Sequence, residues 1–167
     1  MTFNEFVTAR LPALLRYATV VTCDPHLAED IVQEVLLRVQ QRWSRVVRLD
    51  MPEAYVKRMV LNEFLSWRRR RAAREVPLSI GRLDRVATAL SDPGAAVDDR
   101  DELVRHIAAL PPRQRAVLAL RYFEGMADDE IAALMQCREI TVRSHCSRAL
   151  ATLRAALNPT STPVTGG

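Results

Sequence analysis

The sequence has few of the features that mark secreted, metal-binding or membrane-spanning proteins. Its three cysteines, Cys23, Cys137 and Cys146, are odd in number and include no CxxC pair, so neither a disulfide framework nor a zinc site is indicated. Only five glycines are present, which argues against a loop-rich or sandwich architecture. No stretch approaches the roughly 18 uninterrupted apolar residues of a membrane span, and no basic start with an apolar block marks a secretory signal. We therefore expect a protein of the reducing cytoplasm, without membrane insertion.

Residues that could support catalysis or hold a metal are also sparse. His26, His106 and His145 are scattered, without ligand spacing and without a nucleophile nearby. His145 precedes Cys146, but adjacent helix residues point about 100° apart and cannot act as a pair. We expect no metal, no cofactor and no catalytic residue. Cys137 and Cys146 are expected to be buried apolar fillers, with redox sensing as the alternative.

The composition does allow a substantial core. Apolar residues make up 49% of the 167 residues, and Lys plus Arg outnumber Asp plus Glu 24 to 20, for a net charge of +4. This length permits one domain or two small ones. The basic excess is mild, so the placement of charge is more informative than its total.

The stretch 110–157 has the pattern of a helix-turn-helix. Residues 128–135 (DDEIAALM) predict a short amphipathic helix with acids in its first turn, and residues 136–138 interrupt it. A longer helix follows, with an apolar seam at spacings of four and three: Val142, Cys146, Leu150, Leu153 and Leu157. Small hydroxyls and basic groups lie on the opposite side. Such a face suits a DNA major groove, although any two-helix hairpin of a soluble bundle would also expose polar residues.

The first half predicts two amphipathic helices. Apolar spacing favours a helix over 3–21, which Cys23-Asp24-Pro25 ends, and Asp24 is expected to cap the next helix with Pro25 at its first position. That second helix is predicted over 26–45. Its buried stripe ends in Trp43, and its other side is polar except for Leu37. Leu37 is either a stray surface leucine or part of a partner-binding face.

A third helix is predicted to begin at Asp50 and Pro52 and to end in five arginines within residues 68–74. The nearest acids, Glu63 and Glu75, cannot pair with all of them. Basic runs are often only solvated helix ends. Here Phe64 and Trp67 lie beside the run, and aromatics next to cations are suited to unstacked bases.

Between these halves the helical pattern is interrupted by Pro and Gly. Residues 76–99 are interpreted as a flexible linker, with a short helix near 82–90. Another helix is predicted from about residue 100 to the Pro111-Pro112 pair, and residues 158–167 form a polar tail expected to be disordered. The predicted fold is therefore all-α, with two small helical domains at 1–75 and 100–157.

With both halves described, the chain resembles the small extracytoplasmic-function sigma factors of bacterial RNA polymerase. The matching segments are AEDIVQEVLLRVQQRW (28–43), YVKRMVLNEFLSWRRRR (55–71), LPPRQRAVLALRYFEGM (110–126) and EIAALMQC with ITVRSHCSRALATLR (130–154). The resemblance implies an alternative sigma factor, with region 2 in the first domain and region 4 in the second. Such a protein binds core RNA polymerase, recognises the −10 and −35 promoter elements and helps to open the DNA.

The resemblance also implies three sets of site residues. The set expected on the clamp coiled coil of the polymerase β′ subunit is Asp30, Gln33, Glu34, Leu37 and Arg38. The set expected to hold the single-stranded −10 element is Lys57, Arg58, Asn62, Ser66, Trp67, Arg68 and Arg69. The set expected to read the −35 element is Arg138, Thr141, Arg143, Ser144, His145 and Arg148. Further implied partners are the β flap of the polymerase and an anti-sigma factor.

Three positions depart from the family pattern. Gln136 stands where the turn usually has glycine, Ala127 where the helix cap is usually Ser or Thr, and Cys146 where the seam usually has a larger apolar residue. Asp128 or Asp129 is expected to cap one residue later. These departures predict an altered −35 preference.

Two rival functions remain at this stage. A stand-alone transcription factor would bind duplex DNA as a dimer without polymerase. An interaction protein that sequesters helices of another regulator would bind neither duplex DNA nor core polymerase.

Overall fold

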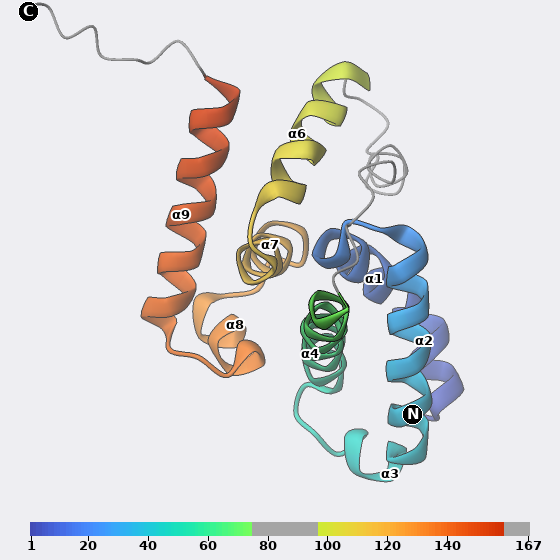
Figure 1. Ribbon diagram of the computed structural model, residues 1–167. Coiled ribbons are helices and arrows are strands. Elements are labelled where there is room, and N and C mark those ends of the chain that lie inside the picture. The colour runs from blue at the N-terminus through green and yellow to red at the C-terminus, as the bar shows by residue number, and fades with distance from the viewer. Residues whose placement is uncertain (75–96, 159–167) are drawn as a thin grey trace, which may run out of the picture.

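The computed structural model describes residues 1–74 and 97–158, and every regular element in these ranges is a helix (Figure 1). The all-α prediction is therefore confirmed. The elements in order are α1 (Phe3–Thr22), α2 (Pro25–Gln41), α3 (Trp43–Val46), α4 (Pro52–Ala73), α6 (Val97–Ala109), α7 (Pro112–Leu118), the π-helical turn η2 (Ala119–Phe123), α8 (Asp128–Met135) and α9 (Glu139–Leu157). The short helix predicted near 82–90 lies outside the described residues, as do the predicted linker 76–99 except for residues 97–99, which belong to α6, and the predicted tail 158–167 except for residue 158.

The N-terminal unit consists of α1 to α4, and its first junction follows the predicted capping. Asp24 accepts hydrogen bonds from the backbone N–H groups of His26 (3.1 Å) and Leu27 (3.3 Å), and Pro25 is the first residue of α2. The predicted second helix is too long, because α2 ends at Gln41. The chain turns at Arg42, and the Trp43 ring then packs against Phe6 of α1 with ring centroids 5.1 Å apart.

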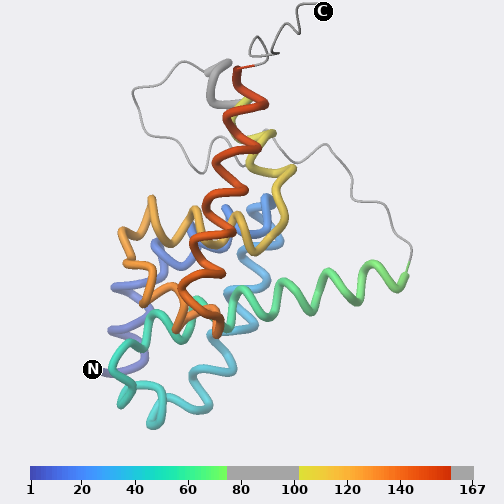
Figure 2. The backbone as a smooth tube through the Cα atoms, turned by 90° about the vertical axis from the view of Figure 1, so that its left-hand side faces the viewer, coloured from blue at the N-terminus to red at the C-terminus, as the bar shows by residue number. Residues whose placement is uncertain are grey.

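Helix α4 completes this unit. It begins at Pro52, as expected, but Met51 rather than Asp50 is its N-cap residue. Val56, Val60 and Phe64 are buried in the shared core with α1 and α2. The C-terminal part of α4, which carries the arginines, extends away from the other helices (Figure 2). The arginine run therefore lies on a projecting helix end.

The C-terminal unit consists of α6 to α9, and α8 and α9 form the predicted helix-turn-helix. Gln136 ends α8 in the left-handed conformation (φ 55°, ψ 47°), where glycine is usually found. The core of the motif includes Ile131, Val142 and the predicted Cys146. Leu157, which was expected in the seam, is exposed because it is the last residue of α9.

The cap of α8 differs from the prediction. Ala127 is the N-cap residue, and the Glu130 carboxylate accepts a hydrogen bond from its N–H at 2.9 Å. Asp128 is not the cap because it is already the first residue of the helix, and its carboxylate accepts a hydrogen bond from Arg121 at 2.9 Å. The expectation of a cap one residue later is therefore wrong.

The two units pack directly against each other. Helix α7 lies on α1, and α8 lies on α4 (Figures 1 and 2). As a result, α4 has one side against its own unit and another side against the helix-turn-helix unit.

Candidate nucleic-acid and partner interfaces

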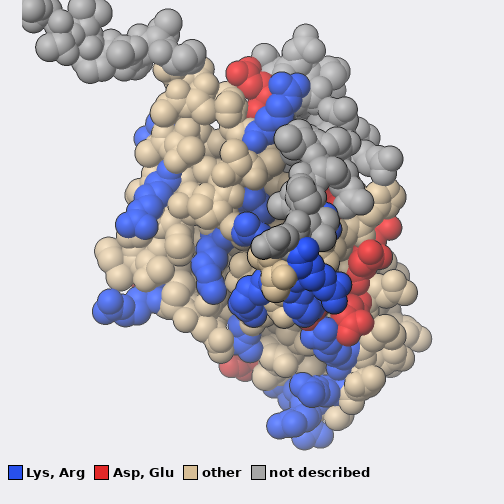
Figure 3. Space-filling view, viewed as in Figure 1, with Lys and Arg blue, Asp and Glu red and all other residues tan. Residues whose placement is uncertain are grey.

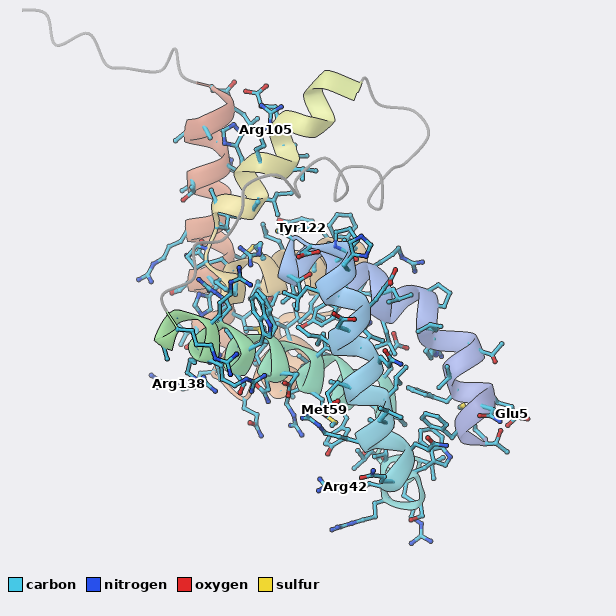
Figure 4. All side chains as sticks on the ribbon, turned by 45° about the vertical axis from the view of Figure 1, so that its right-hand side comes forward. Glu5, Arg42, Met59, Arg105, Tyr122 and Arg138 are labelled. Carbon is cyan, nitrogen blue, oxygen red and sulfur yellow. The ribbon has the colours of Figure 1, made fainter. Side chains whose placement is uncertain are left out.

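The polar face of α9 is accessible to a ligand. Arg143 and Arg148 are exposed, as is Arg138, which projects outward from the ribbon just before the helix (Figure 4). Thr141 and Ser144 lie between them and are half-buried. The structure thus places these five predicted −35 residues on or beside one face of the helix, and the buried seam lies on the opposite side.

His145, the sixth member of that set, has a different environment. It is half-buried, and its Nδ1 atom is buried without a hydrogen-bond partner among the described residues. Burial, together with the positive charges of Arg113 and Arg148, lowers the pKa of His145 below its usual 6.5. The imidazole is therefore held in its neutral form at neutral pH.

The end of α4 presents a basic surface with one aromatic side chain. Arg68 and Arg69 are exposed, and Trp67 is half-buried. Trp67 stacks on Phe64 with ring centroids 5.9 Å apart, and the Arg71 guanidinium lies 5.2 Å from the Trp67 ring centre. Figure 3 shows basic side chains gathered around the end of this helix, and because the one lysine of the chain, Lys57, is buried, they are arginines. A nucleic-acid strand that bound here could therefore contact the Trp67 ring and several arginines at the same time.

Phe64 does not belong to this surface. Only 3% of it is exposed, as its place on the apolar side of the helix predicts, so of the two aromatics beside the arginine run only Trp67 can contact a base. Phe64 belongs to the core that α4 shares with α1 and α2. Conversely, Arg113 of α7 was not predicted as a site residue. It helps line a hollow of about 540 Å³ with Trp67, Arg68 and Arg71, because packing of the two units brings α7 beside α4.

Three other predicted −10 residues are placed less uniformly. Asn62 is exposed, and Ser66 and Arg58 are half-buried. Arg58 lies over the Tyr55 ring at 5.1 Å. These residues belong to the exposed or half-buried parts of α4, so nothing in the described structure covers them completely.

Lys57 is the exception among the predicted −10 residues. Only 3% of it is exposed, and its ammonium pairs with the carboxylates of Glu53 (2.8 Å) and Glu124. Glu53 is one turn earlier in α4, whereas Glu124 belongs to the C-terminal unit. Burial, and then the negative charge of Glu124, raise the pKa of Tyr17 in α1. A ligand could not reach Lys57 in this arrangement.

The face of α2 predicted to bind a partner is open. Asp30, Gln33 and Glu34 are exposed, and Leu37 is 52% exposed. An apolar groove of about 390 Å³ between α1 and α2 is lined in part by Leu37. The face thus combines acids, an amide and an accessible leucine.

Arg38 borders that face and ties α2 to α4. Its guanidinium pairs with Glu63 at 2.8 Å and with Glu34 at 3.0 Å. Burial opposes ionisation of Glu63, but hydrogen bonds from Arg38 and Arg70 outweigh it and lower the pKa of Glu63. Arg38 therefore also orients the two helices relative to each other.

The described residues contain neither a metal centre nor a membrane span. No group of three or more His, Cys, Asp or Glu side chains could hold a metal ion in ranges 1–74 and 97–158. Within the same part of the chain, none of the helices has the length and apolarity needed to cross a membrane.

Comparisons with known proteins match both units. The family description "Sigma-70 region 2" matches residues 6–74, and "Sigma-70, region 4" matches residues 100–153. RNA polymerase sigma-E factor of Streptomyces avermitilis is 35% identical over 162 residues, covering 93% of this chain and 84% of the relative. ECF RNA polymerase sigma factor SigL of Mycobacterium tuberculosis is 32% identical over 148 residues, covering 86% of this chain and 82% of the relative.

A solved structure shares the fold. The sigma factor RpoE from Bartonella quintana, in complex with the anti-sigma factor NepR, matches with a TM-score of 0.71 and 22% identity, covering 96% of this chain and 98% of that chain. Two helical units with a helix-turn-helix in the second are thus the fold of a promoter-recognition subunit of bacterial RNA polymerase. The chain belongs to the sigma-70 family of sigma factors, in its extracytoplasmic-function group. The finer domain limits, 1–75 and 100–157, stay predictions.

Proposed function

We propose that three separate surfaces of this alternative sigma factor divide the work of promoter recognition. The exposed face of α2 binds the β′ clamp coiled coil of core polymerase. The basic end of α4 holds the opened −10 strand, and the polar face of α9 reads the −35 duplex. No covalent chemistry is required of the chain, and its work is done where bacterial DNA lies, in the cytoplasm.

The single observation that carries this division is the accessibility of α9. Its arginines are exposed and its hydroxyl residues are half-buried between them, while Val142 and Cys146 are buried on the opposite side of the helix. Guanidinium groups can contact phosphates and guanine edges in the major groove, and each good bidentate base contact gives roughly 1–3 kcal/mol of discrimination. The phosphate contacts supply affinity that falls as salt rises.

The proposal for α4 follows from stacking and charge. Base–aromatic stacking on a side chain such as Trp67 contributes about 1–3 kcal/mol per base. Arg68 and Arg69 add sequence-independent phosphate contacts. Together these terms offset the few kcal/mol that each unstacked base costs.

The expected partners follow from the same function. Core polymerase contacts the α2 face and, through its β flap, the C-terminal unit. The Bartonella relative is described in complex with an anti-sigma factor, and we propose a comparable inhibitory partner here.

A matched pair of leucine variants tests the polymerase surface. Leu37 and Leu49 are both exposed in the N-terminal unit, at 52% and 43%, but only Leu37 belongs to the α2 face. We expect Leu37→Ala to weaken binding to core polymerase by about tenfold, or about 1.4 kcal/mol, as for an interface residue whose truncation costs more than 1 kcal/mol, and Leu49→Ala to leave it unchanged. Binding is measured by titrating labelled chain with core enzyme, and promoter-directed transcription is measured in parallel.

The same assay separates the rival functions. A stand-alone factor would bind promoter duplex equally well without core polymerase, and a sequestering protein would support no transcription. Equal effects of the two leucine substitutions would contradict the assignment of the α2 face.

A further inference from the structure

The two units meet where α7 lies on α1 and α8 lies on α4, an arrangement that we call the closed contact. It contains buried charged groups from both units. Arg115 of α7 is 6% exposed. Its guanidinium donates two hydrogen bonds to the carbonyl of Val21, from Nε at 3.0 Å and from Nη2 at 2.7 Å. Val21 lies in the last turn of α1, where backbone carbonyls have no partner within the helix. A side chain of the C-terminal unit therefore completes a helix end of the N-terminal unit.

The second polar element of the closed contact is the pair Lys57–Glu124. Glu124 directly follows η2, and its carboxylate reaches the Lys57 ammonium in α4. The side chains of Lys57 and Glu124 are only 4% and 16% exposed. Neither group is therefore mainly solvated. Lys57 also pairs with Glu53 of its own helix at 2.8 Å, so Glu124 is the one of its two carboxylate partners that comes from the other unit.

Lys57 belongs to the helix that, under the proposed function, holds the −10 strand. A lysine that contacts nucleic acid binds a phosphate oxygen with its ammonium group. In the closed contact, a carboxylate oxygen of Glu124 binds the Lys57 ammonium where a phosphate oxygen would otherwise bind. Phosphate and carboxylate are both anionic acceptors of charge-assisted hydrogen bonds, so they compete for the same ammonium.

We propose that Glu124 acts as an internal substitute for a promoter phosphate at Lys57. The closed contact thus withholds part of the −10 site until the two units separate. This inference rests on the proposed function and names how that same site is regulated. It implies that the free chain binds single strands weakly and that separation of the units, as on polymerase, exposes Lys57.

The energetics of buried ion pairs suit a contact that must also open. The attraction within such a pair is largely offset by the desolvation of both charges. The pair therefore defines one arrangement without making separation prohibitively costly. Removal of Glu124 is different, because it leaves the buried Lys57 ammonium with Glu53 alone and without its second anionic acceptor.

The test removes Glu124 from the full chain and uses a matched control. Glu102 of α6 is also an acid of the C-terminal unit, but its side chain is 57% exposed and its one described ion pair is a 3.7 Å contact with His106. Glu124→Ala and Glu102→Ala change the net charge equally. Affinity for a fluorescein-labelled oligothymidylate of about 12 nucleotides, within the site size of strand-binding modules, is measured by anisotropy without polymerase.

We expect Glu124→Ala to bind the oligonucleotide at least about tenfold more tightly than the parent chain, whereas Glu102→Ala stays within about twofold. The gain should disappear in Glu124→Ala combined with Lys57→Gln. Small-angle scattering should show a larger radius of gyration for Glu124→Ala than the roughly 15 Å of a compact chain of this length. If circular dichroism shows that Glu124→Ala does not fold, Glu124→Gln replaces it and is compared with the parent chain and with Glu102→Gln.

Equal affinities of the Glu124 and Glu102 variants would overturn the inference, as would a gain that persists without Lys57. Failure of the proposed function would look different, because the parent chain would then not support promoter-directed transcription with core polymerase. Transcription by the parent chain, combined with no gain in the Glu124 variants, would reject only the internal substitute.

Discussion

The residue that ends α8 offers a sharp test of backbone strain in the helix-turn-helix. Gln136 has φ 55° and ψ 47°, a conformation that costs a residue with a β-carbon roughly 1–2 kcal/mol. Glycine removes this cost but enlarges the conformational freedom of the unfolded chain, which costs about 0.5–1 kcal/mol. Because the Gln136 side chain is exposed, little packing is lost. We expect Gln136→Gly to raise the free energy of unfolding by about 0.5–1 kcal/mol.

The measurement is urea unfolding followed by circular dichroism, extrapolated linearly to zero denaturant. The hydrogen bond from the residue 136 N–H to the Ala132 carbonyl is a backbone bond and should persist. Gln136→Ala is the control, because it removes the side chain but keeps the β-carbon and its strain. A glycine variant no more stable than the parent, or an alanine variant that gains as much, would refute the reasoning.

Two further predictions concern α9. Since the lowered pKa of His145 makes the unfolded chain bind more protons below pH 6.5, the free energy of unfolding should fall as pH drops from about 6.5 to the lowered pKa, then level off. His145→Gln should reduce this slope in urea titrations at several pH values, and an unchanged slope would count against the assignment. Arg148→Ala should weaken holoenzyme binding to promoter DNA about tenfold and reduce the salt slope by about 1, measured by filter binding. Arg154→Ala, exposed further along α9, should change neither, and equal losses would contradict the −35 assignment.

The sequence by itself determined the local structure of the chain. Asp24 and Pro25 specify where α2 begins, because a capping carboxylate and a residue without an N–H are both suited to a helix start. The resemblance to the family placed Gln136 at a turn position that usually has glycine, and the structure confirms a left-handed backbone there. The family and its function also followed from the sequence, because each segment that resembles the family is an uninterrupted stretch of residues and can be recognised without knowing how the helices pack.

Tertiary structure decided what adjacency in sequence cannot specify. Trp43 ends the predicted second helix early, because its ring packs on α1. Phe64 and Trp67 look alike beside the arginine run, yet only Trp67 remains partly exposed. The burial of Lys57 and Arg115 depends on acceptors 67 and 94 residues away. Local patterns report which side of a helix is apolar, but the identity of the opposing group depends on how distant helices pack.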